Sequence, residues 1–299
     1  MTKMLDYFLA LFLLLGIQET SGVPEVPKMM KIFGKVSKYN GTSVELNSDS
    51  IDDDCEQTCF DEPDCILAFF NEKDYCMLVD FNSTVTLEVV ETNREDGLFV
   101  SFKTSLPNET CPAYDYIFPV VKNMGEDDIS WTKTGTTWNF IKCVGNWKMF
   151  QRSDPRIIVC MQVFIMGKGI AKSEGKDYCR SLGTNMTAVA SEQESQWILG
   201  RFKTLYPKPA IWDSVWIDGV RNCTGESNVK CRNFDWSDGY TEGLNALVDT
   251  NACLSVIYQS SYEHCLSVSP QRTTCTINDI SCDRKDKADL GVVCGYRME

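Results

Sequence analysis

Histidine is almost absent from this 299-residue sequence, which contains only His264. No G-x-S-x-G or H-E-x-x-H pattern occurs, and no second histidine is present to act as a general base or a metal ligand. We therefore expect that the protein is not an enzyme. The alternative is a glycosidase-type carboxylate pair among Asp235, Asp238 and Glu242. Acidic groups without other signals are, however, common in the solvated loops of an acidic chain.

Basic charge is also scarce. The formal net charge is −13, which argues against nucleic acid or a heparin-like polymer as a partner, because like charges repel.

Long apolar runs are missing after the N-terminus. There, Lys3 precedes an apolar run over residues 7–17, and small residues follow up to Gly22. This pattern is typical of a secretory signal peptide, predicted over residues 1–22, and the run is shorter than the roughly 20 residues that span a bilayer. An uncleaved N-terminal anchor is the alternative. No second run of spanning length follows, so we expect no membrane insertion.

Cysteine, by contrast, is abundant. Fifteen cysteines in a secreted chain of this length indicate disulfides made in an oxidising compartment rather than zinc or redox sites. The count is odd, and Cys111 in "NETCPAYD" is the candidate for a free thiol or a disulfide-linked dimer. N-x-Ser/Thr sequons, which agree with secretion, occur at Asn40, Asn82, Asn108, Asn185 and Asn222.

The length predicts two domains, divided near residues 107–112. In the first, a helix is expected over residues 54–60, and two disulfides would stabilise a small core. Its four closely spaced cysteines are Cys55, Cys59, Cys65 and Cys76. Together with "MMKIFG" before them and "VSFKTS" after them, this spacing resembles the nematode PAN-like module, also called the CW domain. The resemblance covers residues 28–106 and implies an interaction domain.

The second part predicts an α+β domain. Cys143 and Cys160 bracket residues suited to an opening strand pair. Apolar periodicity predicts helices over residues 169–183 and 191–205, the latter capped by Ser191. Short strands are expected at "VWIDGVRNC", "FDWSDG", "ACLSVIY" and "LGVVCGYR".

These elements together resemble a C-type lectin-like domain over residues 140–299, with residues 107–139 as linker and lead-in strand. Trp147, "WILG", "VWIDG", "FDWSDG", "NDISC" and "GVVCG" carry the resemblance. A PAN-like module followed by such a domain is similar to a family of secreted nematode proteins. The resemblance implies the pairs Cys179–Cys294, Cys253–Cys282 and Cys143–Cys160, with Cys223–Cys231 and Cys265–Cys275 as additional short-range bridges. Sequence alone leaves the connectivity open.

The resemblance also raises the question of calcium. Sugar-binding members of the lectin-like family hold the ion between a loop with a cis-proline and an Asn-Asp pair, here Asn278 and Asp279. No proline occurs over residues 210–269, and apolar side chains in "ALVD" leave only Asp249 and Asn251 as loop ligands. Calcium takes six to eight oxygens, so we expect no tight site. The alternative use of Asn278 and Asp279 is turn and strand-end hydrogen bonding.

The sequence therefore predicts a secreted, glycosylated recognition protein without a cofactor, which binds a glycan, a protein or a microbial surface through its lectin-like domain. Two alternatives are a calcium-dependent lectin with a divergent site and a structural or assembly protein acting through the PAN-like module and Cys111. The resemblance implies a role in extracellular defence.

Overall fold

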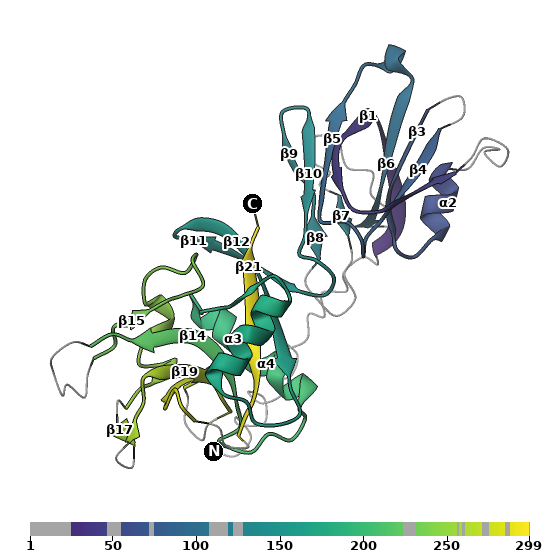
Figure 1. Cartoon of the computed structure of the whole chain (residues 1–299). Coiled ribbons are helices and arrows are strands. Elements are labelled where there is room, and N and C mark those ends of the chain that lie inside the picture. The colour runs from purple at the N-terminus through teal and green to yellow at the C-terminus, as the bar shows by residue number, and fades with distance from the viewer. Residues whose placement is uncertain are drawn as a thin grey trace, which may run out of the picture. The chain divides into compact units, whose positions relative to one another are not determined.

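The computed structural model describes residues 25–46, 55–71, 75–107, 119–121, 128–223, 231–255, 257–258, 261–270, 275–284 and 288–298. The predicted signal peptide, Asn108 and Cys111 lie outside these ranges. The chain divides into two compact units, Met1–Lys142 and Cys143–Glu299, which are mixed α+β and consist mainly of strands (Figure 1). Within the described residues, no helix is long and apolar enough to cross a membrane.

Unit 1 is built on one antiparallel sheet of eight strands, in the order β2-β4-β3-β6-β1-β5-β10-β9. Its strands are β1 (Glu25–Asn40), β2 (Ser43–Leu46), β3 (Cys65–Asn71), β4 (Cys76–Asp80), β5 (Thr86–Glu91), β6 (Leu98–Pro107), β9 (Thr132–Thr134) and β10 (Thr137–Ile141). A separate pair is formed by β7 (Val120–Val121) and β8 (Ile129–Ser130). The helix expected over residues 54–60 is present as α2 (Cys55–Asp61), and a 3₁₀ turn spans Arg94–Asp96.

The unit boundary differs from the expected one. Residues 107–139 were predicted to be linker and lead-in strand, but β9 and β10 within residues 132–141 extend the sheet of unit 1 through β5. The reason is the alternation in "TWNFI", which buries Trp138 and Phe140 beside Trp131 and Phe102. Burying these large rings removes much apolar surface from water. Unit 2 therefore starts at Cys143 rather than at residue 140.

Unit 2 contains a second sheet, whose main path is β11-β12-β21-β14-β19-β20-β16. These strands are β11 (Lys148–Ser153), β12 (Arg156–Ile165), β14 (Ser214–Arg221), β16 (Ala252–Cys253), β19 (Cys265–Val268), β20 (Ile277–Ile280) and β21 (Asp289–Arg297). Short strands β13 (Asn185–Met186) and β15 (Phe234–Asp235) attach to β21 and β14, and β17 (Ile257–Tyr258) pairs with β18 (Ser261–Tyr262). A 3₁₀ turn spans Asn245–Leu247.

Both helices predicted for unit 2 are present, as α3 (Lys172–Ser181) and α4 (Glu192–Leu205). The Ser191 hydroxyl accepts the amide N–H of Glu194 at 3.2 Å, which is the predicted N-cap of α4. Buried Ile198 and Phe202 then attach α4 to the core of the unit. On α3, Gly175 lies so close to β21 that a Cβ there would be 3.2 Å from Val292. This close approach seats α3 directly on the sheet.

Fourteen cysteines of the described chain form seven disulfides. In unit 1 these are Cys55–Cys76 and Cys59–Cys65; in unit 2, Cys143–Cys160, Cys179–Cys294, Cys223–Cys231, Cys253–Cys275 and Cys265–Cys282. Three pairs in unit 2 are those implied by the resemblance.

The expected pairs Cys253–Cys282 and Cys265–Cys275 are corrected by the structure. Cys265 lies opposite Ile280 in the β19–β20 register, so Cys282 is two residues further along the same side. Cys253 lies opposite Asn278 on the other edge of β20, where Cys275 precedes the strand. The tetrapeptide Cys-Leu-Ser-Val occurs at both residues 253–256 and 265–268. Only the second copy is the buried strand β19, and this decides the pairing.

Candidate functional site

The Asn-Asp pair lies on β20, and its aspartate is completely buried. Asp279 forms an ion pair with Arg221, in which both side chains are at most 1% exposed. Its two carboxylate oxygens also accept the amide N–H of Ser255, each at 2.9 Å. The charge of Asp279 is therefore neutralised by a guanidinium from this chain, as a buried carboxylate requires.

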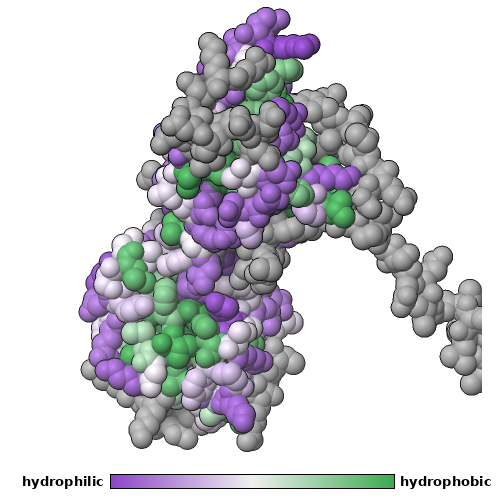
Figure 2. Space-filling view, turned by 90° about the vertical axis from the view of Figure 1, so that its right-hand side faces the viewer, coloured by the Kyte–Doolittle hydropathy of each residue, from purple (hydrophilic) through white to green (hydrophobic). Residues whose placement is uncertain are grey.

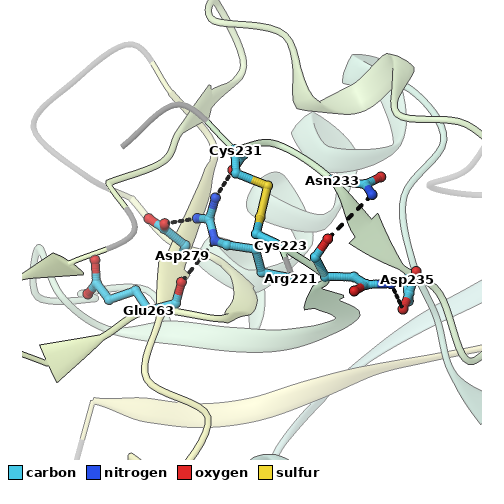
Figure 3. Close-up of a disulfide and its surroundings, with 8 residues drawn as sticks. Arg221, Cys223, Cys231, Asn233, Asp235, Glu263 and Asp279 are labelled. Carbon is cyan, nitrogen blue, oxygen red and sulfur yellow. Dashed lines mark hydrogen bonds and ion pairs between the residues drawn. A yellow bond between two sulfur atoms is a disulfide. The ribbon is translucent and has the colours of Figure 1, made fainter. Parts of the chain in front are cut away.

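Arg221 reaches this carboxylate from the end of β14 and holds two further segments (Figure 3). Its Nη1 donates to the carbonyl of Cys231, and its Nε donates to the carbonyl of Glu263 at 3.2 Å. The guanidinium lies 4.8 Å from the centroid of the Phe234 ring. Burial lowers the pKa of Arg221, an effect that Asp279 opposes. One planar cation thus links segments that are distant in the sequence, because its donors are fixed in a rigid fork.

A second arginine makes a weaker set of links. Arg232 forms an ion pair with Asp249, whose side chain is 91% exposed. Its guanidinium also donates to the carbonyls of Leu247 and Ala252. Arg221 and Arg232 together connect residues 231–233, 244–255 and 262–264, which we call the loop cluster.

The four predicted calcium ligands do not converge. Asp249 points into solvent beside Arg232, and Asp279 is bound by Arg221. The Asn251 side chain is fully buried, where it donates to the carbonyl of Ala246 at 2.8 Å and accepts from the hydroxyl of Ser195 at 3.0 Å. Asn278 is partly buried on β20. These residues therefore do not fit a calcium ion, because the guanidinium of Arg221 already occupies the position beside the Asp279 carboxylate that the ion would take.

Among the described residues, no group of three or more histidine, cysteine, aspartate or glutamate side chains could hold a metal ion. The three acids considered for glycoside hydrolysis have different environments. Asp238 is 2% exposed and accepts from Ala188, Tyr240 and Thr241. Asp235 accepts from Asn222 at 2.8 Å, and Glu242 is exposed. Asp238 thus fixes the chain after "WSDG" through hydrogen bonds from the amides of Tyr240 and Thr241.

The surface of the loop cluster combines apolar and acidic groups. Tyr262 is 61% exposed, and its ring stacks on His264 with centroids 5.5 Å apart. Glu263 lies between them in sequence and accepts the hydroxyl of Ser255 at 2.5 Å; burial raises its pKa. Val248 is 45% exposed in the same cluster. An exposed tyrosine of limited mobility offers a large contact area with a polar tip.

Large apolar side chains are also exposed elsewhere on unit 2. Figure 2 shows hydrophobic residues gathered on the face of this unit that is turned to the viewer, in the lower part of the view. Outside the loop cluster, the exposed apolar side chains of the unit include Leu182, Leu205, Tyr206 and Trp212. Surface of this kind is characteristic of contact regions when it is contiguous.

The predicted glycosylation sites within the described residues are all exposed at the asparagine: Asn40, Asn82, Asn185 and Asn222. The Asn185 amide donates to the carbonyl of Asp238 at 3.0 Å, and the Asn222 amide donates to Asp235. A glycan would replace one of the two Nδ2 hydrogens, so the remaining hydrogen would have to make this contact.

The sequence reasoning missed Arg221 and Arg232. One signal was available in the sequence. Arg221 directly follows the apolar segment "VWIDGV", and a cation at the end of a buried strand needs a carboxylate partner, which Asp279 could supply. The pairing of β14 with β19, and of β19 with β20, brings Arg221 and Asp279 together.

Comparison with known proteins identifies the N-terminal region as a PAN-like domain, with the family match over residues 29–104. The comparison with curated protein sequences gives no match.

Some of the solved structures similar to this chain are described as C-type lectin carbohydrate-recognition domains. Human lithostathine is 16% identical, with a TM-score of 0.36, covering 52% of this chain and 92% of its own. The herring type II antifreeze protein is 16% identical, with a TM-score of 0.35, covering 52% and 100%. The C-type carbohydrate-recognition domain of cow CD23, solved in the presence of an oligosaccharide, is 17% identical, with a TM-score of 0.35, covering 53% and 98%.

Proposed function

We propose that this chain is a secreted, non-enzymatic recognition protein, which binds a glycan, a protein or a microbial surface through the loop cluster of unit 2 without calcium. The observation that carries this proposal is the buried Arg221–Asp279 ion pair. Arg221 brings positive charge to the Asn-Asp pair and joins the segments around it, as a calcium ion would otherwise do.

Preorganisation supports a binding role for the loop cluster. Loops that are fixed before a ligand arrives lose less conformational entropy on binding. Here Arg221 fixes three segments, and the Cys223–Cys231 bridge closes a further loop beside it. Tyr262, backed by His264, is the exposed ring most suited to stacking on a sugar or filling a partner's pocket.

Secretion is supported by the many disulfides, which form and persist in oxidising compartments. The binding assignment, rather than catalysis, is supported by Asp238, whose carboxylate is taken up by structural hydrogen bonds.

The test is binding of the full-length secreted protein to a glycan array and to fixed microbial cells, with calcium or with a chelator. Equal binding in both conditions is expected. The Tyr262→Ala variant should bind about tenfold more weakly, the order expected of an aromatic anchor. The Arg221→Met variant should lose binding because its loops are released. The matched control is Arg180→Met, which breaks the exposed pair Arg180–Asp177 on α3, outside the loop cluster. Binding that the chelator abolishes would support a calcium-dependent lectin instead.

A further inference from the structure

Unit 1 contains a pocket of about 490 Å³ that no function described above uses. It lies beside the first residues of β3, Cys65 and Ile66, and the second half of β6, residues 103–105. β3 pairs with β6 from Leu67, opposite Phe102, while β6 runs on to Pro107 and stays paired with β1 on its other side. The volume lies within the range of small-ligand sites, about 300–1,000 Å³.

One part of the pocket wall is polar and fixed by the fold. The Lys103 ammonium donates to the carbonyls of Cys59 at 3.3 Å and Glu62 at 2.7 Å. The Thr104 hydroxyl accepts the amide N–H of Val120 at 2.9 Å. Asp64 and Ser105 also line this part of the pocket. Polar groups with positions fixed in this way can orient a ligand without first being ordered.

The rest of the wall is apolar and includes Pro27, Pro63 and Phe81. The Phe81 ring is held against Phe140 of β10, with centroids 6.4 Å apart. A ligand with one apolar side and several hydroxyl or amide groups matches this lining. N-acetylglucosamine, the sugar that is attached to asparagine in N-linked glycans, has both: an acetyl methyl group and a hydrogen-bonding ring.

The pocket is also lined by Asn82, the asparagine of the sequon Asn82-Ser83-Thr84. The turn that carries Asn82 is held by Asp80, whose carboxylate accepts the amide N–H of Ser83 at 2.9 Å and whose carbonyl accepts the Thr84 hydroxyl at 2.5 Å. Thr84 is fully buried while Asn82 is exposed. The attachment point of a glycan is thus fixed at the pocket wall.

We propose that the N-linked glycan of Asn82 folds back on unit 1 and that its first N-acetylglucosamine residues occupy this pocket. The glycan would serve as an internal ligand that covers Phe81 and the two prolines. This inference rests on the proposed function only in that N-linked glycosylation requires entry into the secretory pathway.

The chain offers a matched control at Asn40. Its sequon lies directly beside that of Asn82, because the Ser83 hydroxyl donates to the carbonyl of Thr42 at 3.0 Å. Asn40 is exposed but does not line the pocket. Glycans at Asn40 and Asn82 would therefore be close neighbours on unit 1, but only the one at Asn82 would lie beside the pocket.

The experiment uses an endoglycosidase that cuts between the first two N-acetylglucosamine residues of an N-linked glycan. Mass spectrometry measures, for each site, how fast the enzyme releases the glycan from the native secreted protein. We expect release at Asn82 to be slower than at Asn40 by about tenfold or more, because the sugar must first leave the pocket. Unfolding the protein should remove the difference. Phe81→Ala, which opens the apolar wall, should speed release at Asn82 and leave Asn40 unchanged.

Equal release rates in the native protein would overturn the inference, and so would an occupied Asn40 beside an unoccupied Asn82. If the pocket instead takes a saccharide from outside the chain, the Asn82→Gln variant and the glycosylated protein would bind N-acetylglucosamine oligomers equally tightly. That result would also overturn the inference. A chain that is retained in the cell without any glycan would contradict secretion itself, and with it the proposed function.

Discussion

The two units hold their chains together in different ways. Unit 1 relies on a continuous eight-stranded sheet and a core of large rings, and its two disulfides span only 21 and 6 residues around α2. Among the residues that the structure describes, unit 2 has more chain outside helices and strands. It is held by five disulfides and by two buried ion pairs, Arg152–Glu194 and Arg221–Asp279. The sheet of unit 1 joins strands that are distant in the sequence, such as β1 and β6, through its ladder of hydrogen bonds, whereas the long connections of unit 2 are also held by covalent and ionic cross-links.

The largest expected effect is loss of the Cys179–Cys294 bridge, which spans 115 residues. Replacing both cysteines by alanine should destabilise unit 2 by about 5 kcal/mol, against about 2 kcal/mol for Cys59–Cys65, on the chain-entropy estimate. Denaturant unfolding followed with probes specific to each unit measures this. Equal losses in the two units would break the comparison, since loop length would then not matter.

Breaking the buried ion pair should come next. Arg152 and Glu194 are 4% and 2% exposed at their side chains, and Glu194 also accepts the amide N–H of Ala190 at 2.7 Å. The variant Glu194→Gln leaves a buried guanidinium without its counter-charge, which should cost about 3 kcal/mol or more. Unit 1 supplies the control in the exposed pair Lys31–Glu56, 45% and 32% exposed. Glu56→Gln should cost less than about 1 kcal/mol in the same unfolding assay.

A smaller effect should appear as pH dependence of unit 2. Burial lowers the pKa of Lys172 to about 7, an effect that Asp218 opposes and Lys176 reinforces. Its ammonium donates to the carbonyl of Gly219 at 2.6 Å. Between this pKa and the ordinary lysine value the unfolded chain binds more protons than the folded one, so stability rises with pH. Below the folded pKa, both states are protonated and the cost of the buried charge is fully present.

The expected slope above pH 7 is about 1 kcal/mol per pH unit. It should be absent in Lys172→Met, when melting temperatures of the two proteins are compared from pH 6 to pH 9. The same slope in the variant would show that another group of unit 2 is responsible.

Calcium should have the smallest effect. Since the guanidinium of Arg221 already neutralises Asp279, a millimolar concentration of calcium should shift the melting temperature of unit 2 by no more than about 1 °C, because only a ligand that binds the folded state stabilises it. Scanning calorimetry with and without a chelator measures this. A rise of several degrees that Asp279→Ala abolishes would show that the ion displaces the arginine.

Local features of the fold were readable in the sequence. The capping pattern at Ser191 and Glu194 predicted α4, and the residues between Cys143 and Cys160 predicted the β11–β12 pair. These succeed because hydrogen bonds between near neighbours and apolar periodicity are determined within a few residues. The unit boundary was missed, because "TWNFI" identifies a strand but not the sheet that it joins.

The sequence by itself determined the two helices of unit 2, the cysteine-rich composition and the presence of the Asn278–Asp279 pair. The tertiary structure decided which copy of Cys-Leu-Ser-Val becomes the buried strand β19, and therefore which cysteines pair. It also decided that Arg221 reaches Asp279 from a segment 58 residues away. Identical tetrapeptides have identical local preferences, so only burial and strand register, which depend on the whole unit, can distinguish them.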